Sequence, residues 1–282
     1  MASTAEPLKW GSREAASFIR VPSSTDDKYS HGVLGVITGS EEYPGAAVLG
    51  VEAASRTGIG LIRFRGTAEA TRLVLERRPE VVTIAGRVDA FLIGSGIDPT
   101  ALDAQRTAEI DDAVASGHPL VLDAGCLERV LQAAGPVVVT PHHKELARLL
   151  EPHGWDVTRI DRDPAGAASS AADLFGATVV LKGNMTHVCS PADAQGSRFH
   201  AVVEPATTWL ATAGTGDVLA GILGALLATH AEAIASDPQI LGPLAASAVV
   251  VHSLAGLRAS HDGPLVALDV AESIRLVVGE LL

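Results

Sequence analysis

The sequence predicts an α/β fold in which helices cover both faces of a central, mainly parallel sheet. Short apolar runs alternate with longer helical patterns along most of the 282 residues, and this alternation is typical of a parallel sheet. Hydrophobic residues make up 47% of the chain and aromatic residues only 4%. Small aliphatic side chains are therefore expected to build the core and to let helices pack closely on strands. We expect one domain over residues 1–282.

Turn and breaker residues place the expected strands in order. Residues 1–30 contain Pro7, Pro22 and mixed charges, and are expected to be a loosely ordered lead-in. A buried strand is expected wherever a short apolar run ends at turn residues. These runs are 33–38, 61–64, 81–84, 91–93, 119–122, 136–140 and 178–181, and residues 186–189 and 197–203 are expected to form a hairpin.

Helical patterns fill the segments between the strands. Pro44 is well placed to begin a helix because proline fits the first helical position, and Gly58 is typical of a helix end. The other expected helices span 100–116, 143–150, 165–175, 217–229, 243–260 and 269–281.

The composition argues against several classes of protein. The net charge is −12, the pI is near 5.2, and there is no Lys/Arg cluster of the kind that a nucleic-acid binder needs. Residues 1–30 do not resemble a signal peptide, and polar residues or glycine interrupt the longest apolar stretches. Cys126 and Cys189 lack a metal-type spacing and are expected to be reduced thiols. We expect a cytoplasmic protein that binds neither nucleic acid nor membrane.

Residues 212–217, which read Thr-Ala-Gly-Thr-Gly-Asp, form the most informative segment. The glycines precede a long apolar helix, so the backbone N–H groups of Gly214, Thr215 and Gly216 can bind an anion at the helix N-terminus. Asp217 then lies beside the phosphate, where a carboxylate suits proton transfer from a hydroxyl that attacks it. An ordinary capping turn is the alternative. The missing lysine argues against a Walker A loop, and the spacing argues against a Rossmann fingerprint.

Other polar residues follow the expected strands at their carboxyl ends. In an open α/β sheet this edge binds ligands, so these residues are expected to converge on one crevice; they are Gly39-Ser40, Gly94-Ser95-Gly96, Asp123, His142 and Lys182. Each also has a structural alternative. His142 could cap the next helix, Asp123 could cap a helix at 125–133, and Lys182 could be an exposed strand-end charge.

Three other histidines are expected to have no ligand role. His252 lies on an apolar helix and is expected to be a hydrogen-bonded core residue. His187 and His200 have no further partners at a metal-type spacing.

Eight segments, in register over residues 28–260, resemble the ADP/ATP-dependent NAD(P)H-hydrate dehydratases of the ribokinase-like superfamily. They are Thr38-Gly-Ser40, Tyr43-Pro-Gly-Ala-Ala47, Gly58-Ile-Gly-Leu61, Ile93-Gly-Ser-Gly96, Val121-Leu-Asp-Ala124, Thr140-Pro-His142, Val180-Leu-Lys-Gly183 and Thr212-Ala-Gly-Thr-Gly-Asp217. The resemblance implies a ribokinase-like fold and a repair enzyme. Such an enzyme phosphorylates the hydroxyl of hydrated NADH or NADPH with ADP or ATP and Mg²⁺, and elimination of phosphate restores the dinucleotide.

The resemblance also implies roles for individual residues. It points to Asp217 as the catalytic base. It assigns Ala46, Ala47, Gly94, Gly96, His142 and Asp217 to the hydrate, and Lys182, Gly183, Asn184, Met185, Thr186, Gly214, Thr215 and Gly216 to the adenine nucleotide. The sequence departs from the family pattern at His143 and Lys144, where Pro-Gly is usual, and in segment 204–211.

Two other functions are compatible with the anion turn. A vitamin kinase of the same superfamily, acting on hydroxyethylthiazole or pyridoxal, would use the same turn and aspartate. A non-catalytic nucleotide-binding protein would not need Asp217 and Lys182. The resemblance further implies a homotetramer and an NAD(P)H-hydrate epimerase as functional partner. We expect that partner to be a separate chain, because only about thirty residues precede the first expected strand.

Overall fold

A computed structural model describes residues 6–282. Its strands are β1 (Leu8–Lys9), β2 (Val33–Ile37), β3 (Leu61–Phe64), β4 (Ala90–Ile93), β5 (Leu120–Leu122), β6 (Val137–Val139), β7 (Thr178–Leu181), β8 (Thr186–Cys189) and β9 (His200–Val203). Its α-helices are α1 (Ser12–Ala16), α2 (Pro44–Thr57), α3 (Ala68–Arg77), α4 (Ala104–Val114), α5 (His143–Leu150), α6 (Pro164–Phe175), α7 (Thr215–Thr229), α8 (Ala231–Ser236), α9 (Leu241–Ser260) and α10 (Ala267–Leu281). A 3₁₀ helix spans Ala124–Gln132.

The strands form one nine-stranded sheet in the order β1-β9-β8-β7-β6-β5-β4-β2-β3. All neighbours pair in parallel except β8, which runs antiparallel to β7 and to β9. The expected mainly parallel sheet and the expected hairpin are therefore confirmed. The central strands are buried along their whole length, as parallel strands covered on both faces should be.

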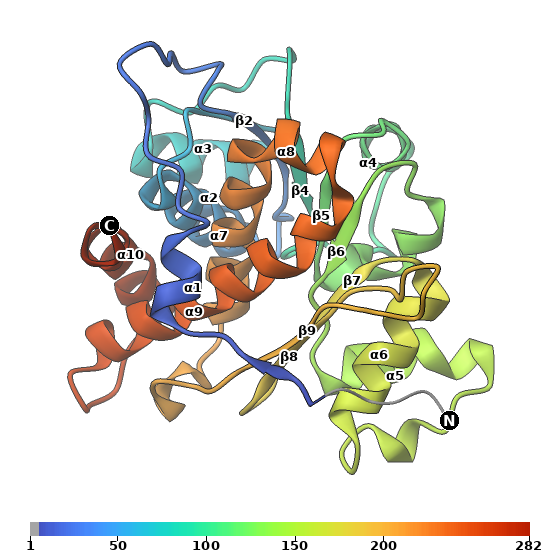
Figure 1. Cartoon of the computed structure of the whole chain (residues 1–282). Coiled ribbons are helices and arrows are strands. Elements are labelled where there is room, and N and C mark those ends of the chain that lie inside the picture. The colour runs from blue at the N-terminus through green and yellow to red at the C-terminus, as the bar shows by residue number, and fades with distance from the viewer. Residues whose placement is uncertain (1–5) are drawn as a thin grey trace.

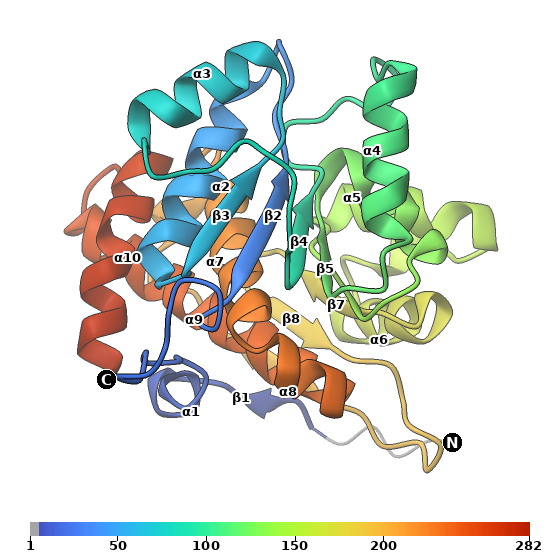
Figure 2. The same cartoon turned by 90° about the horizontal axis from the view of Figure 1, so that it is seen from above.

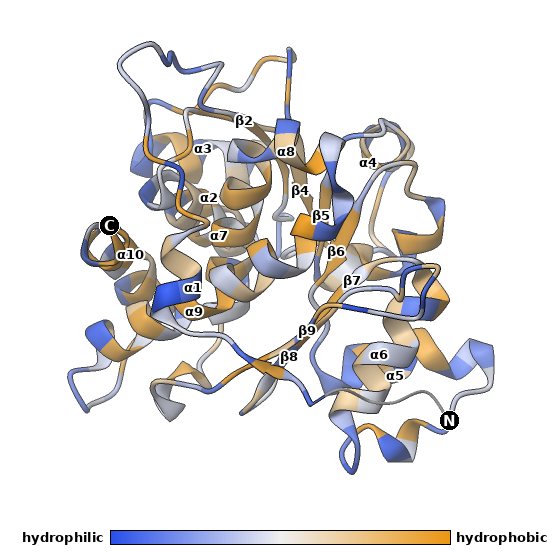
Figure 3. Ribbon diagram, in the orientation of Figure 1, coloured by the Kyte–Doolittle hydropathy of each residue, from blue (hydrophilic) through white to orange (hydrophobic). Residues whose placement is uncertain are grey.

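Helices cover both faces of the sheet, as Figures 1 and 2 show. Successive residues of a strand point to opposite faces, so Leu92 joins the core with α2, α7, α9 and α10, while Ile93 joins the core with α4, α5 and α6. The apolar colouring of Figure 3 follows the strands and the helices that pack on them. Helix α7 packs closely against α2 and β4, which fixes its N-terminus at the carboxyl edge of the sheet.

The lead-in is more ordered than the sequence suggested. Residues 1–5 lie outside the described part of the chain, but β1 pairs with β9 and α1 packs on α9. Trp10 explains this order, because its ring contacts Phe18 and Phe199 and its Nε1 donates to Ser247 Oγ at 3.0 Å. The prediction of a loose segment over residues 6–30 was therefore wrong in part.

The strand expected at 81–84 is also wrong. A single isolated bridge joins Val82 to Arg63, and Ile84 is 71% exposed. The guanidinium of Arg63 donates to the carbonyls of Ile84 and Arg87. Beyond the Val82 bridge, this segment is therefore bonded to a side chain and not to the backbone of a neighbouring strand. Helix α3, which the sequence reading missed, begins where Thr67 Oγ1 accepts from the N–H of Ala70.

Helix α9 is apolar enough to resemble a membrane span. The helical segment Pro238–Ser260, which includes α9, has a mean hydropathy of 1.8, but 78% of its most apolar window is buried inside the fold. It packs on α7, α10 and the strands β7, β8 and β9. The burial identifies α9 as a core helix.

Candidate active site

The carboxyl ends of the strands meet at one edge, as the sequence predicted. The N–H of Gly39, after β2, donates to the carbonyl of Ser95, after β4, at 2.8 Å. His142 and Lys182, which follow β6 and β7, form a parallel bridge. Gly94 lies so close to Asp123 that a Cβ there would be 2.0 Å from the Asp123 carbonyl oxygen, and its φ is +117°. Only glycine fits this contact.

The glycine turn before α7 has the geometry expected of an anion site. Gly214 is the N-cap residue in a left-handed conformation, with φ of 88°, and α7 begins at Thr215. The hydroxyl of Thr215 donates to the carbonyls of Leu210 and Thr212, both at 2.9 Å, which fixes the turn. Gly216 and Asp217 therefore lie in the first helical turn, where backbone N–H groups have no helical acceptor.

Asp123 is part of a buried polar network and does not cap the 3₁₀ helix that follows it. Asp123 stands at the N-cap position, but its side chain makes no capping hydrogen bond, so the interpretation of its carboxylate as a helix cap was wrong. One carboxylate oxygen, Oδ1, accepts from Thr140 Oγ1 at 2.7 Å and from Lys182 Nζ at 3.0 Å, and Oδ2 accepts from Ser95 Oγ at 2.8 Å. Burial alone would raise the pKa of Asp123, but the charge of Lys182 and these hydrogen bonds outweigh it and lower the pKa.

Lys182 is correspondingly more than an exposed charge at a strand end. Its side chain is 21% exposed. Burial would lower its pKa, yet the nearby carboxylates of Asp123 and Glu145 raise it. Its Nζ lies 3.4 Å from the position that a Cβ on Gly216 would take. A fixed cation thus stands directly beside the anion turn.

Asp217 has the most strongly altered environment of the site. Burial raises the pKa of Asp217 to about 7, with a further contribution from the negative charge of Asp123, and Lys182 offsets part of this effect. A carboxyl group with a pKa near neutrality can both accept and return a proton at ordinary pH. The structure thus gives the predicted base a suitable proton affinity.

The predicted nucleotide residues gather around one cavity of about 630 Å³. Lys182, Gly183, Asn184, Thr186, Thr215 and Gly216 line it, whereas Met185 and Gly214 do not. His142, which the resemblance assigns to the hydrate, lines this same cavity beside the predicted nucleotide residues. Its Nδ1 accepts from the N–H groups of Lys144 and Glu145 at 3.1 and 3.2 Å, so the helix-cap interpretation of His142 is confirmed.

His252 is buried in α9, as predicted, but it is not the fully hydrogen-bonded core residue that the sequence suggested. It lines this cavity and is buried, yet its Nε2 has no hydrogen-bond partner among residues 6–282. Burial lowers the pKa of His252 to about 4, so its ring is neutral. The only sequence signal was a polar residue on an apolar helix, which does not distinguish a wall of a cavity from a core position.

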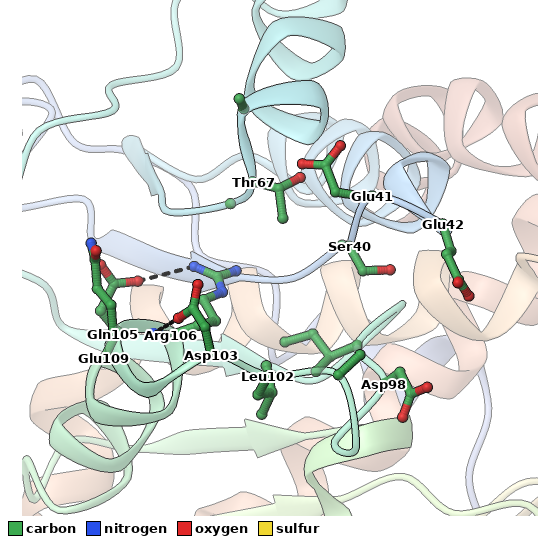
Figure 4. Close-up of a pocket in the computed structure, with 15 residues that line it drawn as sticks. Ser40, Glu41, Glu42, Thr67, Asp98, Leu102, Asp103, Gln105, Arg106 and Glu109 are labelled. Carbon is green, nitrogen blue, oxygen red and sulfur yellow. Dashed lines mark hydrogen bonds and ion pairs between the residues drawn. The ribbon is translucent and has the colours of Figure 1, made fainter.

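A second cavity of about 510 Å³ lies beside the Gly39-Ser40 turn (Figure 4). Its polar lining is mostly acidic, and its lining side chains include Glu41, Glu42, Asp98, Asp103, Glu109, Arg106, Ser40, Thr67 and Gln105. Arg106 is already engaged, because it donates to Glu109 at 3.1 Å and to the carbonyl of Arg65 at 2.9 Å. The cavity therefore has no unpaired lysine or arginine among its described lining residues.

None of the four small residues assigned to the hydrate is among the residues that line either cavity. Ala47 and Gly96 instead pack against Gly39, which borders the second cavity. A Cβ on Gly96 would be 2.5 Å from the Ala46 Cβ, and a Cβ on Gly39 would be 3.0 Å from the Ala47 Cβ. Ala47 is fully buried and Gly94 is buried. Their small size lets α2 approach the turns after β2 and β4.

Residues 6–282 contain no group of three His, Cys, Asp or Glu side chains arranged to hold a metal ion. His187 and His200 face each other across β8 and β9, with Nδ1 and Nε2 separated by 3.4 Å. Asp123 is paired with Lys182 and is therefore not a free metal ligand. Asp217 is the carboxylate that lies beside the anion turn. Among the described residues, a Mg²⁺ ion at this site would therefore have to take most of its ligands from bound phosphates and water.

Solved structures place this fold in the ribokinase-like class. An ADP/ATP-dependent NAD(P)H-hydrate dehydratase from Bacillus subtilis, co-crystallised with ATP and Mg²⁺, superposes with a TM-score of 0.83 at 23% identity and covers 98% of this chain and 99% of its own. A ribokinase-like superfamily protein from Enterococcus faecalis gives 0.79 at 22% identity, covering 97% and 96%. A hydroxyethylthiazole kinase from Pyrococcus horikoshii gives only 0.60 at 18% identity. At these identities the likeness establishes the fold.

Sequence comparison narrows this class to one family. The profile of the NAD(P)H-hydrate dehydratases matches residues 34–275, and the chain belongs to this family. An ADP-dependent (S)-NAD(P)H-hydrate dehydratase from Neisseria meningitidis is 34% identical over 269 residues, which cover 88% of this chain and 85% of that protein. A bifunctional NAD(P)H-hydrate repair enzyme from Mycobacterium leprae is 40% identical over 228 residues, covering 76% of this chain and 45% of its own. The chain spans about half the length of such bifunctional relatives.

Proposed function

We propose that this protein dehydrates (S)-NADHX and (S)-NADPHX, the hydrated forms of NADH and NADPH, at the expense of ADP or ATP. The observation that carries the proposal is the family match, which spans residues 34–275 and so includes the anion turn and Asp217. The reaction is a carbon–oxygen lyase reaction. It returns an inactive dinucleotide to use and is therefore a form of metabolite repair.

In this proposal Asp217 is the catalytic base. The hydroxyl of the hydrate attacks the terminal phosphorus of the nucleotide while Asp217 takes the hydroxyl proton, and the bond to the bridging phosphate oxygen breaks. The N–H groups of Gly214, Thr215 and Gly216 stabilise the charge on the transferring phosphoryl group. Phosphate then leaves as its carbon–oxygen bond breaks, and the electron pair of the ring nitrogen forms an iminium ion. Loss of a proton from the adjacent ring carbon returns that electron pair to nitrogen and restores the double bond of the reduced nicotinamide.

The two cavities supply binding space on either side of this chemistry. The cavity of about 630 Å³ is proposed for the adenine nucleotide, with Lys182 and the segment from Gly183 to Thr186 along its wall. The hydrate is proposed to lie against Ala46, Gly96 and His142, with the buried Ala47 and Gly94 directly behind that surface, and to extend into the cavity of about 510 Å³. Mg²⁺ is proposed to shield the charge of the nucleotide phosphates.

The acidic cavity favours hydrated NADH over hydrated NADPH. Carboxylates suit the hydroxyls of a ribose, whereas a 2′-phosphate needs a free cation such as arginine. Arg106 is already paired with Glu109. We expect kcat/KM to be higher for hydrated NADH, and equal values would place the adenosine end of the substrate elsewhere.

The alternative is phosphorylation of a vitamin alcohol such as hydroxyethylthiazole or pyridoxal. Its support is limited to the shared fold. The deciding experiment incubates the purified protein with hydrated NADH, Mg²⁺ and either ADP or ATP, and follows the absorbance of the restored reduced nicotinamide. Vitamin alcohols are tested in parallel by nucleotide consumption. Phosphorylation of one of them without any conversion of either hydrate would overturn the dehydratase proposal.

We further propose a cytoplasmic homotetramer of single-domain subunits that works beside an NAD(P)H-hydrate epimerase. The bifunctional repair enzymes among its relatives support a partner activity. Light scattering of the purified protein tests the tetramer. Acceleration by an added epimerase, on a mixture of hydrate epimers, tests the functional partner.

A further inference from the structure

The network around Asp123 is more elaborate than binding a nucleotide requires. Asp123 is 2% exposed, and both of its carboxylate oxygens are hydrogen-bonded, to Ser95, Thr140 and Lys182. Asp123 follows β5, and its partners Ser95, Thr140 and Lys182 follow β4, β6 and β7, so the ends of four neighbouring strands meet at this one carboxylate. Such a fully bonded buried carboxylate has a fixed position and stays ionised.

Within residues 6–282, Lys182 is the one cation that contacts Asp123, and it lies between that carboxylate and the anion turn. Its Nζ is 3.0 Å from Asp123 Oδ1 and 3.4 Å from the place of a Cβ on Gly216. Two other carboxylates, Asp217 on α7 and Glu145 on α5, are close enough to influence it. Without Asp123, the flexible lysine would be free to pair with Asp217 and block the base.

We propose that Asp123 is a positioning residue for the reaction: it holds the Lys182 ammonium beside the anion turn and away from Asp217, and its negative charge keeps Asp217 ready to take a proton. This inference rests on the proposed function. It assigns no contact between Asp123 and substrate. Asp123 acts through Lys182 and through its charge.

The pH dependence expected for Asp217 follows from the charged groups around Asp123 and Lys182. Asp123, after β5, raises the proton affinity of Asp217, and Lys182, after β7, lowers it. Glu145 of α5 faces Lys182 and lies 3.6 Å from His142 Nε2. His252 of α9 also lies close enough for Lys182 to influence it. The two single substitutions at the ion pair should therefore shift the proton affinity of Asp217 in opposite directions.

The test compares the acidic limb of the kcat/KM profile for the hydrate in Asp123→Asn, Lys182→Gln and the wild type. Asp123→Asn keeps the shape and removes the charge, so the limb should move to lower pH by about one unit. The plateau kcat should fall by about tenfold or more, because Lys182 is released toward Asp217. Lys182→Gln should move the limb to higher pH. Asp89→Asn is the matched control, since Asp89 pairs with Arg87 at the opposite end of β4, and its limb should not move.

An unchanged limb in Asp123→Asn, or a shift of both variants in the same direction, would overturn the inference, because damage to the fold lowers activity without producing opposite shifts. If Asp123→Asn does not fold, Asp123→Ser, which also removes the charge, takes its place in the comparison with Lys182→Gln. A wild type that is inactive on both hydrates would instead refute the proposed function, which keeps the two failures distinct.

Discussion

Asp217→Asn is expected to make the protein more stable while removing its turnover. Burial, with a contribution from the charge of Asp123, raises the pKa of Asp217 to about 7 from an ordinary value of 3.8. The folded protein therefore holds this proton more tightly than the unfolded chain does. As the pH rises from about 4 to 7, ionisation of Asp217 costs folding free energy, at about 1.4 kcal/mol for each pKa unit. The accumulated cost is about 4 kcal/mol at pH 8.

Asparagine has the same shape and no charge, so the variant should escape this cost. The free energies of unfolding of the two proteins should be similar at pH 4 and differ by about 4 kcal/mol at pH 8, in favour of the variant. For a chain of this size that difference raises Tm by on the order of 10 °C. Urea denaturation at both pH values measures it, with Asp89→Asn as control. A difference that does not change with pH would refute the assigned environment of Asp217.

The same residue sets the expected pH dependence of the wild-type rate. A base must be ionised to accept a proton, so kcat/KM should rise with pH through about 7, and at pH 6 only about a tenth of the Asp217 side chains are ionised. Asp217→Asn should bind nucleotide normally and lose about 10²–10⁴-fold in kcat. Near-normal turnover in the variant would remove Asp217 from the mechanism.

Three further substitutions test the remaining parts of the site. Lys182→Ala should weaken nucleotide binding more than hydrate binding, and it should destabilise the protein by about 3–5 kcal/mol because Asp123 is left buried without its partner. Separate titrations of the two ligands and a Tm measurement check these effects. Equal weakening of the binding of both ligands would indicate a purely structural role for Lys182. Gly216→Val should reduce nucleotide affinity at least tenfold, on the order of 1.4 kcal/mol, since a branched side chain beside Lys182 Nζ blocks the anion turn; unchanged affinity in a folded variant would contradict the anion site. His142→Ala should raise KM for the hydrate several-fold, as expected for a lost hydrogen bond of about 0.5–1.5 kcal/mol. The lost helix cap should also cost about 1 kcal/mol of stability. An effect on nucleotide affinity larger than the effect on KM for the hydrate would assign His142 to the nucleotide, whose cavity it lines.

The sequence predicted the sheet and its functional edge because both depend on local signals. Apolar runs that end in Gly39-Ser40 or in Gly94-Ser95-Gly96 identify buried strands and their turns without knowledge of their neighbours. Residues 81–84 failed this reading. Their apolar character resembles that of a strand, but a long-range partner, the Arg63 side chain, donates hydrogen bonds to the carbonyls of Ile84 and Arg87.

The role of Asp123 could not be predicted locally for the same reason. An aspartate before a short helix is an ordinary cap, and nothing in the adjacent residues contradicts that interpretation. The contrary evidence comes from Lys182, 59 positions later, and from Ser95 and Thr140 on the flanking strand ends. The position of His252 on the wall of a cavity could not be predicted locally either, because it depends on how α9 packs beside α7. Both residues are defined by packing between elements that are distant in the sequence.

The first turn of α7 holds an unfavourable arrangement of charges, and the rest of the fold must compensate for its cost in stability. A partly buried carboxylate, Asp217, lies beside the turn proposed to bind phosphate, and a second carboxylate, Asp123, makes its ionisation less favourable still. Lys182 offsets only part of this effect, since Asp123 already holds it. Helix α7 can keep Asp217 in this position because nearly all of its other residues are buried, against α2, α9 and the strands. Stability that comes from the core of the protein is thus lost at the residue proposed to perform the chemistry, as expected when a site is selected for activity and not for stability.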